Sequence, residues 1–159
     1  MPRSPTSCDG DVIRYLPDTN VWLALALSGH PQHDLARRWW DGVEGRGSVL
    51  MCRATQQSVL RLLTTAAVFV PLGDQPLTNT EAWAVVDALA ADDRVVTVSI
   101  EPSRTPLLWR EYSSVPASAP KTWMDAYLAA FSRAADATLV TVDGAFRSYA
   151  ELDLLLLGY

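Results

Sequence analysis

Short apolar segments alternate with longer amphipathic segments along most of this chain, and this alternation limits the fold more than any other feature. The short segments have the length and the Val, Ile and Leu content of buried strands, whereas the longer ones place apolar residues at helical spacing. Their order is strand, helix, helix, strand, helix, helix, strand, helix, helix, strand and strand. Parallel strands joined by helical crossovers produce such an order. We therefore expect a three-layer α/β/α domain around a central, mainly parallel sheet of four to five strands.

The same pattern places the boundaries of the elements. The expected strands lie at residues 12–16, 48–52, 94–100, 137–142 and 152–157. The expected helices lie at residues 21–28, 31–44, 54–66, 81–92, 106–112 and 122–135. Residues 1–11 are rich in Pro, Ser and charge, so we expect a flexible N-terminal tail followed by one domain over residues 12–159.

Charge, apolar content and cysteines narrow the class of protein. The net charge of −5 argues against a protein that coats nucleic acid through bulk electrostatics, although an acidic metal site still binds phosphate through its ion. No apolar run approaches the roughly 20 residues that span a membrane. Cys8 and Cys52 suggest neither a disulfide framework nor a zinc site. These features favour a cytoplasmic protein with reduced cysteines and no membrane contact.

Three aspartates fall where the expected sheet would bring them to one edge. Asp18 follows the first strand, Asp143 follows the fourth, and Asp125 begins the helix that leads into the fourth strand. Ligands bind at the carboxyl ends of strands in open α/β sheets. Carboxylates gathered there repel one another unless a cation lies between them. Their oxygen atoms suit Mg²⁺ or Mn²⁺, and the chemistry expected of such a site is metal-assisted hydrolysis of phosphodiester bonds.

Each of these residues also has an ordinary structural interpretation. Asp18 is well placed to cap a helix, and Asp125 lies in a first helical turn, where the helix dipole favours an acid. Arg61 is equally compatible with a solvated surface position. A phosphatase with a strand-end Asp nucleophile is a weaker alternative, because Asn20 stands where such enzymes carry a second Asp.

Four segments of the chain stand out together: DTNVWLALA, TQQSVLRLLT, TWMDAYLAAFS and ATLVTVDGAF, in this order and at these intervals. They resemble the PIN-domain ribonuclease toxins of the VapC family, which form the toxin half of bacterial type II toxin–antitoxin pairs. Each segment alone is a weak signal, whereas their ordered combination is specific. The resemblance extends from about Val12 to the C-terminus and implies a PIN-like fold.

The resemblance also implies roles for particular residues. The acids that hold the metal and support catalysis in the family fall on Asp18, Asp125 and Asp143. The expected supporting residues are Asn20, Gln56, Arg61 and Thr141. The family's second acid, usually a Glu, falls near Gln56, which contributes no charge. This departure raises the alternative of a catalytically impaired PIN-like module that binds RNA or protein.

The partners implied by the resemblance are an RNA substrate and a VapB-like antitoxin. Such toxins usually dimerise, so a homodimer or a toxin–antitoxin hetero-oligomer is expected. The antitoxin's C-terminal segment is expected to cover the acidic edge. The exposed apolar residues of the expected helices at residues 54–66 and 81–92, including Trp83, are expected to form the contact surface. The function implied is a Mg²⁺- or Mn²⁺-dependent endoribonuclease that the antitoxin neutralises.

Overall fold

The computed structural model describes residues 13–158, so the expected tail, including Cys8, lies outside the described residues. Five strands form one sheet in the order β3-β2-β1-β4-β5, and every pair of neighbours is parallel. The strands are β1 (Tyr15–Pro17), β2 (Val49–Cys52), β3 (Val95–Val98), β4 (Thr138–Thr141) and β5 (Leu154–Leu156). The expected parallel sheet is confirmed.

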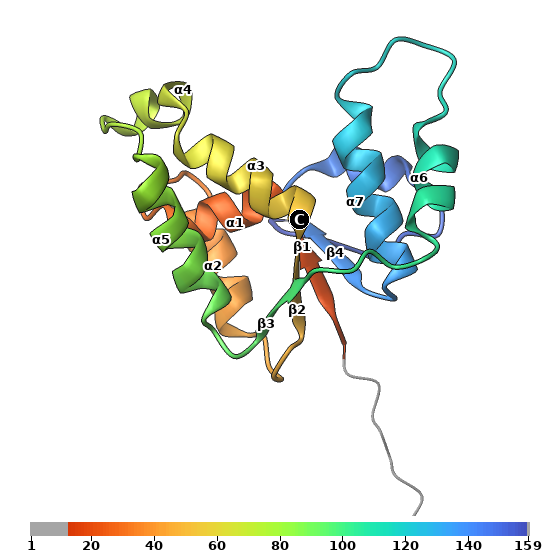
Figure 1. Cartoon of the computed structure of the whole chain (residues 1–159), viewed down its shortest axis with the longest axis horizontal. Helices are drawn as coiled ribbons and strands as arrows, with labels where there is room; N and C mark the ends of the chain where they lie inside the picture. Colours follow the sequence, from red (N-terminus) through yellow and green to blue (C-terminus); the bar gives the residue numbers. More distant parts are fainter. Residues whose placement is uncertain (1–12, 159) are drawn as a thin grey trace, which may run out of the picture.

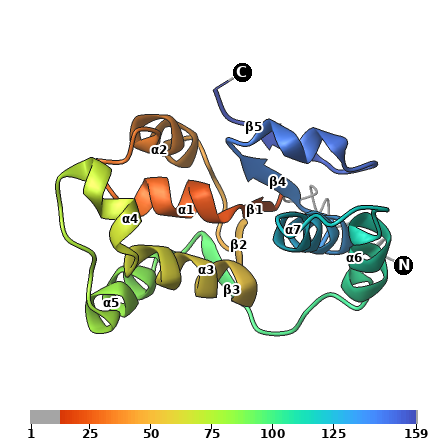
Figure 2. The same cartoon turned by 90° about the horizontal axis from the view of Figure 1, so that it is seen from above.

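Helices cover both faces of this sheet. The helices are α1 (Thr19–Ala26), α2 (His33–Asp41), α3 (Arg53–Leu63), α4 (Ala66–Phe69), α5 (Asn79–Ala90), α6 (Thr105–Ser113) and α7 (Thr122–Ala134), with two 3-10 helices, η1 (Val70–Leu72) and η2 (Gly144–Ser148). Figures 1 and 2 show α1 to α5 gathered on one side of the strands and α6 and α7 on the other. The three-layer α/β/α arrangement is therefore also confirmed. None of the helices in the described residues has the length and apolar content required to cross a bilayer.

The alternation of side chains along β2 separates two apolar cores. Val49 and Met51 pack with the helices of the α1 to α5 side, in a cluster that includes Trp22. Leu50 and Cys52 belong to the cluster on the α6 and α7 side. Since successive side chains of a strand point to opposite faces, one fully buried strand supplies both cores.

The helix expected at residues 54–66 ends earlier than its apolar pattern indicated. The Thr64 hydroxyl donates hydrogen bonds to the carbonyl oxygens of Leu60 and Arg61, at 3.1 and 3.0 Å. The Thr65 hydroxyl donates to the Arg61 carbonyl at 2.6 Å. Threonine hydroxyls that bond to nearby backbone compete with the helical ladder. The chain therefore leaves α3 after Leu63, and α4 and η1 occupy part of a stretch expected to be irregular.

Candidate active site

Asp18 lies at the junction of β1 and α1. The parallel register pairs Pro17 with Val140, so the next position of β1 lies beside Thr141. Asp18 Oδ2 accepts a hydrogen bond from Thr141 Oγ1 at 2.5 Å, and Oδ1 accepts one from the Val21 backbone N–H at 2.9 Å. The residue is only 3% exposed. Asp18 thus caps α1, as its ordinary interpretation required, and at the same time presents a fixed, buried carboxylate.

Burial makes the charged form of Asp18 costly. The pKa of its carboxyl is raised from 3.8 to about 6, mainly by desolvation and to a smaller extent by the nearby charge of Asp125. Hydrogen bonds from Thr141 and from the backbone of Val21 and Asn20 act in the opposite direction. A cation beside Asp18 would relieve this cost, because it stabilises the ionised carboxylate.

Asp125 is the acid that links the other two. It lies half-buried in the first turn of α7. Burial raises the pKa of its carboxyl, the charge of Asp143 adds to this effect, and Lys121 opposes it. The interaction of Asp125 with both Asp18 and Asp143 places the three carboxylates in one electrostatic group.

Asp143 is the most solvent-accessible of the three acids. Its backbone N–H donates to Thr141 Oγ1 at 3.0 Å, and its Oδ1 accepts a hydrogen bond from the Ala145 N–H at 2.8 Å, which caps η2. The Thr141 hydroxyl therefore connects Asp143 to Asp18. Asp143 combines a capping role with a position beside the other acids.

A pocket of about 240 Å³ opens above Asp18 and Asp125. Asn20 and Arg61, two of the expected supporting residues, also line it. Arg61 is exposed, and among residues 13–158 its guanidinium group forms no hydrogen bond or ion pair. The pocket therefore combines acidic groups with a cation that is available to a ligand.

Gln56 has a different environment from the other expected supporting residues. It is 7% exposed, and its Oε1 accepts a hydrogen bond from Arg53 Nη1 at 2.5 Å. The amide oxygen is thus directed to a side chain of its own helix, α3. A carboxylate at this position would be paired with the Arg53 cation.

The donor set fits a hard divalent cation that retains water. Within the described residues, no group of three His, Cys, Asp or Glu side chains is compact enough to hold an ion by itself. Mg²⁺ is commonly bound by one or two carboxylates together with waters and substrate phosphates. Asp18 and Asp125 in one pocket, with Asp143 close to Asp125, match this mode better than a closed protein cage.

Sequence reasoning missed several residues around the acids. Ser58 lines the pocket from α3, and Phe146 lines it from η2. The charge of Asp125 contributes to raising the pKa of Tyr149 to about 12, although burial is the larger cause. Ser58 is three residues before Arg61 on the same helix, so helical spacing would have placed it on the face of Arg61. No comparable local signal identifies Tyr149.

Comparison with known proteins places this chain in a described family. The PIN domain family matches residues 15–152 of the chain. Ribonuclease VapC41 of Mycobacterium tuberculosis is 50% identical over 143 residues, which cover 90% of this chain and 98% of that protein. Ribonuclease VapC33 of the same organism is 27% identical over 138 residues, which cover 86% of this chain and 93% of that protein.

Solved structures share the fold at low sequence identity. VapBC2 from Rickettsia felis, bound to a promoter DNA fragment, aligns with a TM-score of 0.61 and 11% identity, covering 91% of this chain and 99% of that chain. VapC20 of Mycobacterium tuberculosis, described as a Sarcin-Ricin loop cleaving toxin, aligns with a TM-score of 0.58 and 17% identity, covering 87% and 97%. These similarities concern the fold alone.

Proposed function

The chain belongs to the PIN-domain family and to its VapC ribonucleases, and we propose that it is the toxin of a type II toxin–antitoxin pair. Its activity is divalent-metal-dependent endoribonucleolytic cleavage, and a VapB-type antitoxin neutralises it. The observation that carries the proposal is the buried Asp18 carboxylate, which shares a pocket with Asp125 and Arg61.

The acids are assigned to metal binding. Asp18 and Asp125 would hold Mg²⁺ or Mn²⁺, and Asp143 would complete the acidic group. Such an ion, when bound, supplies Lewis-acid catalysis and neutralises charge at the phosphate. The Thr141 hydroxyl fixes the orientation of Asp18, and it also accepts the backbone N–H of Asp143.

The remaining supporting residues are assigned to the RNA. Arg61 is the cation of the pocket, and it would contact a phosphate of the strand being cut. Asn20 lines the same pocket and would offer an amide to the sugar or phosphate. Gln56 would support α3 through its contact with Arg53, with no direct role in metal binding.

Cleavage of total RNA by purified, antitoxin-free protein tests this proposal. We expect cleavage with Mg²⁺ or Mn²⁺, complete loss with a chelator, recovery when the metal is restored, and inhibition by the antitoxin. Asp87→Asn, an acid-to-amide change on the exposed surface of α5, is the matched control and should leave cleavage unchanged. Cleavage that persists in chelator would contradict the metal requirement.

The same assay decides the competing function, a PIN-like module without catalysis. Gln56 motivates this alternative, because it places an uncharged residue near the family's second acid. If the wild type binds RNA without cutting it and Gln56→Glu restores metal-dependent cleavage, the module is the correct description. We expect the reverse, with an active wild type and a small effect of Gln56→Glu, since Arg53 would pair with the new carboxylate.

Thr141→Val should move the pH dependence of cleavage. The Thr141 hydrogen bond lowers the pKa of Asp18, which burial holds at about 6, so loss of that bond should raise the pKa further. Metal binding requires the ionised carboxylate. The acidic limb of the profile of kcat/KM against pH should therefore shift upward by about one pH unit, since a hydrogen bond to a charged group contributes about 1.5 kcal/mol or more. An unchanged profile would show that Thr141 does not tune Asp18.

The proposal also covers the partner of the protein and the compartment in which it acts. We infer that the toxin forms a complex with its antitoxin and acts in the cytoplasm, where its RNA substrate is found. Self-association of the toxin stays a prediction, which light scattering on the antitoxin-free protein and on the complex would measure.

A further inference from the structure

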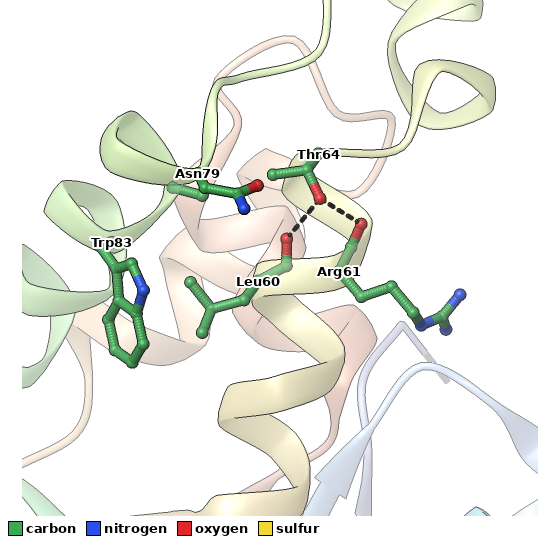
Figure 3. Close-up of a pocket in the computed structure, with 6 residues that line it drawn as sticks. Leu60, Arg61, Thr64, Asn79 and Trp83 are labelled. Carbon is green, nitrogen blue, oxygen red and sulfur yellow. Dashed lines mark hydrogen bonds between the residues drawn. The ribbon is translucent and has the colours of Figure 1, made fainter.

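A second pocket, of about 260 Å³, lies between α3 and α5. Figure 3 shows Trp83 and Asn79 on α5, Leu60 on α3 and Thr64 just after the end of α3 around this space. Trp83 is 47% exposed although it is a large aromatic residue, and Asn79 is exposed at the start of α5. The pocket thus offers an accessible indole and an amide group beside an apolar lining that includes Leu60 and Ala82.

Arg61 joins this second pocket to the acidic pocket. It lines both of them. In Figure 3 its guanidinium group extends away from the Trp83 ring, from the same helix that supplies Leu60. Arg61 therefore lies between the two pockets, with its guanidinium group directed away from Trp83 and with Asp18 and Asp125 among the other residues of the acidic pocket.

We propose that the pocket between α3 and α5 binds an unpaired nucleobase of the RNA substrate, next to the phosphate contacted by Arg61. This inference rests on the proposed ribonuclease function. Trp83 supplies a face for base stacking, and Asn79 hydrogen-bonds to the base edge. The substrate is therefore a single-stranded or looped segment whose base is free to leave the stack.

The chemistry of the pocket favours a base over a peptide. Single-stranded RNA is commonly recognised by stacking on aromatic side chains and hydrogen bonding to base edges, with nearby cations on the phosphates. The order Trp83, Arg61, Asp18 supplies stacking, phosphate binding and metal ligation along one path. The volume is below that of pockets for drug-sized ligands, so it suits one ring system rather than a folded segment.

Kinetics on a defined RNA test the inference. The substrate is a single-stranded oligonucleotide that contains a cleavage site identified in total RNA, and a base-free phosphodiester, bis(p-nitrophenyl) phosphate, serves as the second substrate. Trp83→Ala should raise KM for the RNA by about 5- to 100-fold with a smaller change in kcat, because stacking on an aromatic contributes strongly to affinity. Trp83→Phe should restore most of the affinity. Hydrolysis of the base-free substrate should not change.

Abasic substitutions locate the base. Oligonucleotides that lack one base at a time are compared between wild type and Trp83→Ala. For one abasic position near the cleaved bond, the KM of the wild type should equal that of Trp83→Ala, because the base that stacks on Trp83 is missing. Asn79→Ala should likewise raise KM only for substrates that keep the base at this position. Leu107→Ala, which removes a 69% exposed apolar side chain of α6, controls for a general loss of apolar surface.

The outcomes separate this inference from the proposed function. If the wild type cuts neither substrate, the ribonuclease proposal itself fails. If it cuts RNA but Trp83→Ala has the wild-type KM, the nucleobase site is wrong. Binding of the antitoxin to each variant is measured in parallel, and a loss of antitoxin binding with unchanged KM would assign the pocket to the protein partner. Thermal melting of each variant confirms that the comparison is made on folded protein.

Discussion

Asp18→Asn should abolish RNA cleavage and, at the same time, make the metal-free protein more stable near pH 8. The loss of cleavage, by at least about 100-fold, follows from removal of a buried metal ligand. The gain in stability has a separate cause, because the buried Asp18 carboxyl has its pKa raised from 3.8 to about 6. Near pH 8 the folded protein must therefore keep an unfavourable charge, which the amide lacks.

The sign of the pH dependence follows from this shift. Protonated Asp18 is favoured by folding, so its contribution to stability is fully present below pH 3.8 and is lost as the pH rises through about 6. The shift corresponds to about 3 kcal/mol at most. Asn also preserves an oxygen that can accept the Val21 N–H as a helix cap.

Melting curves in chelator measure the effect. We expect Asp18→Asn to melt about 4 to 8 °C above the wild type near pH 8, and the difference to shrink near pH 4. Adding Mg²⁺ should stabilise the wild type and leave Asp18→Asn unchanged, because only a ligand that binds the folded state raises its stability. Asp87→Asn is again the control. Equal melting temperatures at both pH values would show that the buried charge is compensated without a metal.

Arg94→Ala should produce the largest loss of stability among surface charge substitutions, about 2 to 4 kcal/mol. The guanidinium of Arg94 donates hydrogen bonds to the carbonyl oxygens of Trp40 and Val43, at 2.8 and 3.3 Å, at the C-terminal end of α2. It lies 4.1 Å from the centre of the Trp40 ring and forms two hydrogen bonds with Asp92. Loss of the guanidinium would leave the carbonyl oxygens of Trp40 and Val43 and the carboxylate of Asp92 without this donor. It would also remove the cation–π contact with the Trp40 ring.

Urea denaturation at neutral pH measures this prediction, with Arg46→Ala as the matched control. Arg46 is 86% exposed and lies 3.9 Å from Asp93, so its removal should change stability by less than about 0.5 kcal/mol.

The hydrogen bond from Arg94 lowers the pKa of Asp92 from 3.8 to about 2. The contribution of this Asp92–Arg94 pair to the stability of the folded protein is fully present above pH 3.8 and is lost as the pH falls through about 2. The cost of Arg94→Ala should accordingly diminish in acid, and similar losses for both variants would argue against the network.

The sequence predicted the fold closely, because its signals were local. Each buried strand was short and apolar, and each helix carried apolar residues at helical spacing, so the order of elements and the parallel sheet followed. Boundaries were less accurate where a side chain competes with the backbone. Thr64 and Thr65 end α3 through hydrogen bonds to the carbonyls of Leu60 and Arg61, which apolar periodicity does not register.

The candidate site shows the same difference between features that local sequence predicts and features that depend on distant residues. The positions of Asp18 and Asp143 after strands, and of Asp125 at a helix start, were evident from the order of elements. Their surroundings were not, because they depend on residues distant in the chain. The contact of Asp18 with Thr141 joins residues 123 positions apart, and it requires the pairing of β1 with β4.

The sequence by itself therefore determined which elements form, in what order, and which acids stand at the carboxyl ends of strands, since these properties depend on neighbouring residues. Only the tertiary structure decided how those acids behave. Packing of α1 and β4 around Asp18 removes water from its carboxyl and raises its pKa. Packing of α3 against α5 creates the Trp83 pocket and makes Arg61 common to both pockets. Desolvation and shared walls arise only when distant segments meet.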